Sequence, residues 1–264
     1  MMDVLLSTNM YDKGMLKRVL KYLLEFKGRI GVEVFPLFQD AGYEDELINC
    51  MKVLETIPSS FHGPYYRAEH SAFKGSEEYV RTMDYVRKTL EYCKKLNSKY
   101  MVFHHNNCKV KKEHREEMIR NSCENFREME KLFGEAQIPV YVENAGVMDR
   151  GNMLFNQEEF IALCKNEKYR VLIDIGHAHA NGWNLSDTME ALKDQIKAYH
   201  IHNNDGIHDD HNRIMDGTLD FDKFISDYRR FTPEADIVVE YSREVADDED
   251  GIKEDVDYIL KAFH

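Results

Sequence analysis

Histidine and acidic side chains recur along this 264-residue chain directly after short apolar runs. They lie at the ends of these runs or in the segments that follow: His62, His104, His105, Glu143, Asp174, His177, His179, His200, His202, Asp205, His208, Asp209, His211 and Glu240. Carboxylates held close together disfavour each other's ionisation, so a group of them beside imidazoles calls for a cation. Imidazole and carboxylate donors without thiolate suit Zn, Mn or Co. If the fold brings these residues together, they predict a site for one or more divalent metal ions.

Each of these residues, taken alone, also has a structural interpretation. A carboxylate at the end of a strand often caps a helix or forms a salt bridge in a loop. His104 and His105 could be one buried and one solvent-facing imidazole, and Asp209-Asp210-His211 could be a solvated acidic loop. The metal interpretation therefore depends on whether the elements of the fold bring the side chains to one place.

Short apolar, β-branched runs alternate with longer amphipathic stretches along the chain. The runs are Val4–Ser7, Ile30–Phe35, Ser60–His62, Tyr100–His104, Pro139–Glu143, Arg170–Asp174, Ala198–His202 and Ile237–Tyr241. Apolar residues at helical spacing predict helices over Glu77–Lys95, Lys112–Phe133 and Gln157–Lys165. Asp187 and Asp220 each precede a helical pattern, so we expect both to be helix N-caps.

Strands that alternate with helices over this length predict parallel βαβ units. No linker or change of composition divides the sequence, so we expect one domain over residues 1–264. The count and size predict an α/β protein of the (β/α)8 TIM barrel type, a single domain. The alternative, an open doubly wound sheet, usually has a Gly-rich turn after its first strand, where this chain has Ser7-Thr8-Asn9. In a barrel, six of the predicted strands would deliver an imidazole or a carboxylate to the face where active sites lie.

Charge and composition narrow the classes of partner. Lys and Arg number 35 against 48 Asp and Glu, a formal charge of −13, which disfavours nucleic acid as a partner. No apolar stretch approaches the length of a membrane span, and the first residues do not resemble a signal peptide. The five scattered cysteines suit reduced thiols, so we expect a cytoplasmic protein. A homo-oligomer is compatible with the sequence, which shows no interface pattern.

Taken as a set, the motifs resemble the xylose-isomerase-like TIM-barrel superfamily, which holds sugar isomerases and epimerases together with the endonuclease IV phosphodiesterases. The motifs are Phe61-His62-Gly63-Pro64-Tyr65, Val142-Glu143-Asn144, Asp174-x-x-His177, His200-x-His202-Asn203, Asp209-x-His211 and Glu240. One departure is the loop after His211, where relatives tend to have a Gly-x-Gly turn. This chain has Met215-Asp216-Gly217, which keeps the second glycine alone and puts the path of the loop in doubt.

The isomerase and epimerase branch implies one metal held by Glu143, Asp174, His200 and Glu240. In this hypothesis the catalytic pair Glu143 and Glu240 flanks a carbon of a small sugar or sugar derivative, one removing a proton and the other returning it. The metal polarises the adjacent carbonyl and hydroxyl. The resemblance leaves His202 as a residue behind the ligands or a substrate contact, and Trp183, Tyr65 and Tyr66 as candidate walls against the sugar.

The endonuclease IV branch implies three zinc ions held by nine ligands. The residues of this chain that match those positions are His62, His104, Glu143, Asp174, His177, His200, Asp209, His211 and Glu240. From the two branches together, we expect a cofactor of one to three ions of Zn, Mn or Co. The alternative function is thus a multi-zinc phosphodiester hydrolase. Lys109, Lys111, Lys112 and Arg115 follow the fourth predicted strand and Arg67 follows Tyr66, as phosphate contacts or as a solvated helix start. A third hypothesis is a metal-binding barrel that serves as a partner subunit without catalysis. The acidic balance favours the small-molecule sugar substrate.

Overall fold

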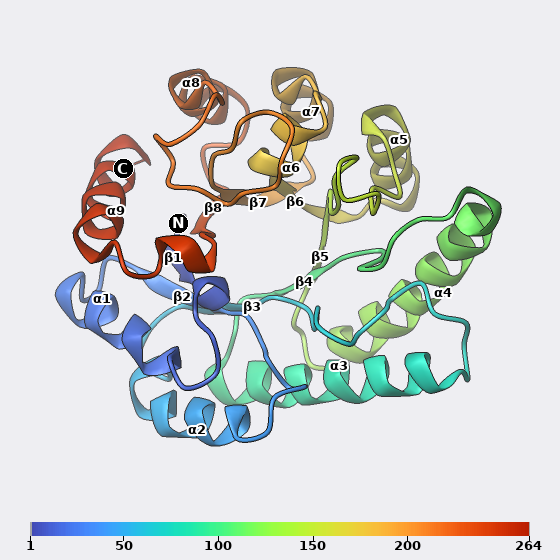
Figure 1. Cartoon of the computed structure of the whole chain (residues 1–264), viewed down its shortest axis with the longest axis horizontal. Helices are drawn as coiled ribbons and strands as arrows, with labels where there is room; N and C mark the ends of the chain where they lie inside the picture. Colours follow the sequence, from blue (N-terminus) through green and yellow to red (C-terminus); the bar gives the residue numbers. More distant parts are fainter. Residues whose placement is uncertain (1, 264) are drawn as a thin grey trace.

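The computed structural model describes residues 2–263, in which eight parallel strands close into a barrel in chain order (Figure 1). The strands are β1 (Val4–Ser7), β2 (Gly31–Val34), β3 (Ser59–Phe61), β4 (Met101–Phe103), β5 (Val140–Glu143), β6 (Arg170–Asp174), β7 (Ile196–Ile201) and β8 (Asp236–Val239). Each strand pairs with the next along the chain, and β8 pairs with β1 through Leu5 and Val238. The predicted (β/α)8 barrel, a single domain, is confirmed.

Helices surround the strands (Figure 1). They are α1 (Val19–Glu25), α2 (Tyr43–Leu54), α3 (Glu77–Leu96), α4 (Arg115–Gly134), α5 (Gln157–Glu167), α6 (Ile175–Ala180), α7 (Leu185–Leu192), α8 (Phe221–Phe231) and α9 (Glu249–Phe263). In α3, Met83, Val86, Leu90 and Cys93 recur at intervals of three or four and are buried, because they lie on one face of the helix. Between residues 2 and 263, no helix is long and apolar enough to span a membrane.

The differences from the predicted elements lie at their ends. β7 begins at Ile196, two residues before the predicted start, and the predicted helix from Lys112 begins as a short 3-10 turn before α4. Asp220 caps α8 as predicted, its carboxylate accepting from the backbone N–H of Lys223. The prediction for Asp187 is wrong: it lies inside the first turn of α7, and the side chain of Asn184 caps that helix. Asn and Asp are both good N-cap residues, so residue type alone does not favour Asn184 over Asp187.

Apolar side chains from β1, β4, β6, β7 and β8 fill the interior of the barrel. Its apolar cluster is Leu5, Tyr100, Val102, Leu172, Ala198 and Val238. Side chains alternate across a strand, so the neighbouring residues pack outward against the helices. Because this core is filled, polar side chains from the carboxyl ends of the strands are confined to the mouth of the barrel.

Candidate metal centre

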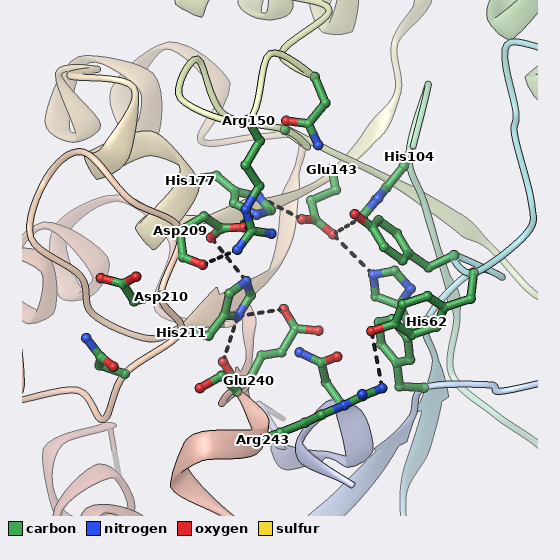
Figure 2. A pocket seen from close by; sticks show the side chains of 18 of the residues that line it. His62, His104, Glu143, Arg150, His177, Asp209, Asp210, His211, Glu240 and Arg243 are labelled. Atoms are coloured by element: carbon green, nitrogen blue, oxygen red, sulfur yellow. Dashed lines mark hydrogen bonds and ion pairs between the residues drawn. The ribbon is translucent and has the colours of Figure 1, made fainter. Parts of the chain in front are cut away.

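A cavity of about 590 Å³ opens at the carboxyl ends of the strands (Figure 2). Seven of the nine predicted ligands line it: His62, His104, Glu143, His177, Asp209, His211 and Glu240. The other two, Asp174 and His200, are fully buried beside this lining. The fold therefore brings all nine residues to one place from six strands and the segments that follow them.

The first group of donors surrounds Nδ1 of His200, on β7. Glu143 Oε2 lies 3.3 Å from this nitrogen, Asp174 Oδ2 3.9 Å and Glu240 Oε2 3.5 Å. One imidazole nitrogen thus faces three carboxylates from three other strand ends. This is the donor set that the resemblance implied for a single metal ion.

Two further groups of donors adjoin the first. In one, Oε2 of Glu143 lies 2.8 Å from Nε2 of His104 and 3.9 Å from Nε2 of His62. In the other, Oδ1 of Asp209 lies 3.4 Å from Nε2 of His177 and 3.1 Å from Nε2 of His211. Nδ1 of His177 is also 3.1 Å from Oε1 of Glu143. Glu143 therefore contacts all three groups. Figure 2 shows its carboxylate between His177 on one side and His104 and His62 on the other.

The protonation of the cluster follows from burial and from the mixture of charges. Burial raises the pKa of Glu240 to about 7. Burial also acts to raise the pKa of Glu143, but the imidazoles of His104 and His200 outweigh it and hold that pKa well below its ordinary value. Burial acts to lower the pKa of His200, yet the carboxylates around it raise that pKa well above its ordinary value. The carboxylates likewise raise the pKa values of His177 and His211, so without a metal the protons on these histidines and on His200 balance the carboxylates, and a divalent cation would displace them.

The donors present fit a divalent metal ion. Among the described residues, four buried atoms of the predicted ligands have no hydrogen-bond partner: His177 Nδ1, His200 Nδ1, Asp209 Oδ1 and Glu240 Oε1. Buried polar atoms are nearly always satisfied, and one or more bound cations would satisfy these atoms. Their nitrogen and oxygen chemistry suits Zn, Mn or Co.

The loop between β7 and α8 places Asp209 and His211. It folds back on itself through a pair of backbone hydrogen bonds between Asn203 and Asn212, of 3.1 and 2.9 Å. A Cβ on Gly217 would lie 2.2 Å from Oδ1 of Asn203, so only glycine fits there. Met215, at the position of the missing first glycine, is 52% exposed and has room for its side chain. The departure from the Gly-x-Gly pattern therefore does not keep the loop from the cavity.

His202 contacts a predicted ligand and lies outside the described lining of the cavity. Its Nε2 lies 3.0 and 3.1 Å from the two oxygens of Asp174, and its ring stacks on His211 with centroids 3.7 Å apart. A Cβ on Gly176 would lie 2.0 Å from Cε1 of His202, so glycine is required for this close packing. Two roles were predicted for His202, a residue behind the metal ligands or a substrate contact. Its position behind Asp174 agrees with a residue behind the ligands and not with a substrate contact.

The predicted aromatic walls divide between the cavity and the core. Tyr65 and Tyr66 line the cavity together with Phe35. Trp183 is missing from the described lining, because its ring packs on Phe160 of α5 with centroids 5.8 Å apart. The prediction that Trp183 forms a wall of the substrate site is therefore corrected: Trp183 packs against α5.

The predicted basic residues also lie outside the described lining. Lys109, Lys111 and Lys112 are exposed, and so is Arg67. Arg115 pairs with Glu159 of α5, which holds two helices together. None of these five contributes a cation to the walls that the structure describes, which agrees with the solvated-surface interpretation.

Three residues that the sequence analysis did not single out belong to the site. Glu33, on β2, is fully buried and contacts His200. Arg150 and Arg243 line the cavity on opposite sides of the view in Figure 2, and each is tethered by an ion pair, to Asp209 and Asp12 respectively. The signal for Glu33 was a charged residue inside an apolar strand pattern. The two arginines lie in loops, where the sequence offers no comparable pattern.

The comparisons with known proteins agree with this architecture. Similar solved structures include a D-tagatose 3-epimerase-like protein (TM-score 0.78, 17% identity, 98% of each chain) and an IOLI protein with a bound zinc atom (0.77, 16%, 99% of this chain and 98% of that chain). Another is a family 2 AP endonuclease from Brucella melitensis (0.70, 18%, 93% and 96%). At these identities the likeness shows a shared fold. The model of the xylose isomerase-like TIM barrel family matches residues 23–262, so the chain belongs to that family.

Proposed function

We propose that the protein is a divalent-metal-dependent isomerase or epimerase of a small sugar or sugar derivative. One observation carries the proposal: Glu143, Asp174 and Glu240 surround the same nitrogen of His200 beside a cavity of about 590 Å³. This volume is in the range of small-molecule sites. The sugar epimerases among proteins of this fold support the same class of reaction.

The residues of the site have separate tasks in this proposal. Asp174 and His200 hold the metal together with the two glutamates. When bound, the metal polarises the carbonyl and hydroxyl oxygens of the substrate. Glu143 and Glu240 lie at the ends of β5 and β8, one removing the proton from the carbon beside the carbonyl and the other returning a proton. Tyr65 and Tyr66, whose rings meet edge to face at 5.3 Å, form an apolar wall that covers the substrate from water.

Charge supports a small substrate over a nucleic acid. The chain carries a net charge of −13, and the predicted basic residues lie outside the described cavity lining. Binding to a nucleic acid depends on neutralising many phosphates with Lys and Arg. A substrate that fits inside the cavity needs no such surface. We also propose a cytoplasmic location, because all five cysteines are free thiols.

Metal content and proton exchange test this proposal together. We expect about one Zn, Mn or Co per chain by elemental analysis of protein purified without added metal or chelator. A screen of ketoses and aldoses in deuterated water should show exchange at the carbon next to the carbonyl. Glu240→Gln should abolish that exchange, and Glu116→Gln, on the exposed side of α4, is the matched control. Exchange that persists in Glu240→Gln contradicts the two-carboxylate proposal.

A multi-zinc phosphodiester hydrolase is the second candidate. The specific observation in its favour is the pair of adjoining donor groups around His104 and Asp209, which a single-metal isomerase does not require. Several metals held side by side clamp the attacking and leaving oxygens of a phosphate ester. Close to three zinc ions per chain, with cleavage of an abasic-site oligonucleotide or a small phosphodiester, would replace the isomerase proposal with this one.

A further inference from the structure

We infer that Glu33 is a positioning residue for the metal centre, which holds the ring of His200 so that Nδ1 faces the three carboxylates. The inference rests on the proposed metal binding at this site. It adds a seventh strand, β2, to the six that supply the donors, and it assigns a role to a buried carboxylate that the proposed reaction does not otherwise use.

The contacts of Glu33 are few and well defined. Its Oε1 lies 2.8 Å from Nε2 of His200, and its Oε2 accepts a hydrogen bond of 3.1 Å from Oγ of Ser60 on β3. Glu33 and His200 are both fully buried, so water does not compete for either contact. A buried carboxylate destabilises a fold unless it is paired and hydrogen-bonded. The pairing with His200 supplies that compensation.

The two nitrogens of His200 face different partners. Nε2 points to Glu33, and Nδ1 faces Glu143, Asp174 and Glu240 at 3.3 to 3.9 Å. A neutral imidazole carries one N–H, and an ionised carboxylate only accepts hydrogen bonds. Glu33 therefore holds the N–H at Nε2 and leaves the lone pair of Nδ1 for a metal. Carboxylates behind a ligating histidine fix its tautomer and its orientation in this way.

The position of Glu33 argues against a role as a ligand itself. Glu33 does bring a donor atom within 4.8 Å of donors from His200 and Glu240. A metal held at Nδ1 among the three carboxylates would, however, lie on the side of the ring away from Nε2, the nitrogen that Glu33 contacts. Glu33 is also missing from the described lining of the cavity, so it does not meet the substrate. Its effect has to pass through His200.

Zinc affinity of metal-depleted protein, measured by calorimetry without substrate, tests the inference. Glu33→Leu removes the acceptor, and the dissociation constant for Zn²⁺ should rise about 10- to 100-fold. Glu33→Gln keeps an acceptor oxygen for Nε2–H and should restore most of the affinity. Ser60→Ala, which removes the other bond of Glu33, is the matched control and should change the constant less than about threefold. Equal loss in the Leu and Gln variants, or no loss in Glu33→Leu, would overturn the inference.

A second measurement remains informative if Glu33→Leu does not fold. In zinc-loaded protein with ¹⁵N-labelled histidine, NMR should show His200 with its proton on Nε2, assigned with a His200→Gln variant. A proton on Nδ1 would overturn the inference. The outcomes also separate the two proposals: a wild type that binds no divalent metal removes both, whereas wild-type affinity in a folded Glu33→Leu removes the role of Glu33 alone.

Discussion

The histidines at the mouth of the barrel include two neighbouring groups with different surroundings. The carboxylate-facing group includes His104 and His211, and the aromatic group includes His70 and His105, which pack on Phe103. His104 points to the carboxylate of Glu143, whereas the next residue, His105, lies among Phe103, Phe126 and Phe155 and bonds to Ser122. Burial lowers the pKa of His105 to about 3. Successive side chains at a strand end point to opposite sides, so His104 enters the cavity and His105 enters the aromatic layer behind it.

The carboxylate-facing histidines and the aromatic group therefore differ in their pKa values. Burial lowers the pKa of His70, in the aromatic group, to about 4. For His211 burial acts in the same direction, but Asp209 and Glu240 outweigh it and raise the pKa to about 9. A histidine is a candidate ligand here because of its carboxylate partners. Residue type is the same in both groups, and burial acts on the pKa in the same direction in both.

The largest effect is expected for Glu143→Gln, because this carboxylate contacts all three donor groups. Under the proposed function, turnover should fall about 10²- to 10⁴-fold. Metal content, measured by elemental analysis, should fall with it. His105→Gln, in the aromatic group, is the control and should keep the wild-type metal content. A Glu143→Gln protein with full metal and activity would remove the distinction between the two groups.

A smaller loss is expected for His62→Ala. His62 reaches a carboxylate of the cluster at Glu143, at 3.9 Å, and its ring packs edge to face on His104. It is not among the four donors of the proposed single metal. Activity should fall roughly tenfold or less, with about one metal retained per chain. Elemental analysis and the exchange assay measure both. Loss of all metal together with activity would instead indicate a cluster of several ions.

The two groups should also respond to pH with opposite sign. His70 has a folded pKa of about 4, below the ordinary 6.5, so the unfolded chain binds the proton first. Its contribution to stability is present above pH 6.5 and is lost as the pH falls toward 4, by about 2–3 kcal/mol. Urea unfolding at several pH values should show a shallower acid loss in His70→Asn than in the wild type.

His211 provides the opposite case in metal-depleted protein. Its folded pKa of about 9 lies above the ordinary 6.5, so its contribution is present below pH 6.5 and lost as the pH rises toward 9. His211→Gln should reduce the pH dependence of the free energy of unfolding between pH 6.5 and 9 and leave that dependence unchanged at acid pH. The same slope in wild type and variant would contradict the assigned surroundings of His211.

The smallest effect is expected for Lys111→Glu. Lys111 is exposed and lies outside the described cavity lining, so a small substrate should not sense it. Turnover should change less than about twofold and should depend little on salt. A large, salt-dependent loss would indicate a polyanionic substrate and favour the hydrolase.

The fold was largely predictable because it depends on a repeated local pattern. Eight apolar runs and the spacing within Glu77–Lys95 locate the strands and α3, and the strand ends bring the nine donors together. The choice of Asn184 over Asp187 as a cap depends on a single turn that composition does not encode. Trp183 was misplaced because an aromatic residue packs equally well against a ligand or a helix. Glu33 was missed because its partner, His200, lies 167 residues away.

That separation has a consequence for how the protein is made. The contact between Glu33 and His200 joins the first strands to the last ones, and Glu240 completes the donors only with β8. During synthesis, the early part of the chain emerges before these later residues exist, and a domain generally folds as a unit. A partly synthesised chain therefore carries the carboxylates of Glu33 and Glu143 without their imidazole from β7. Completion of the ring and assembly of the site are thus the same late event in folding.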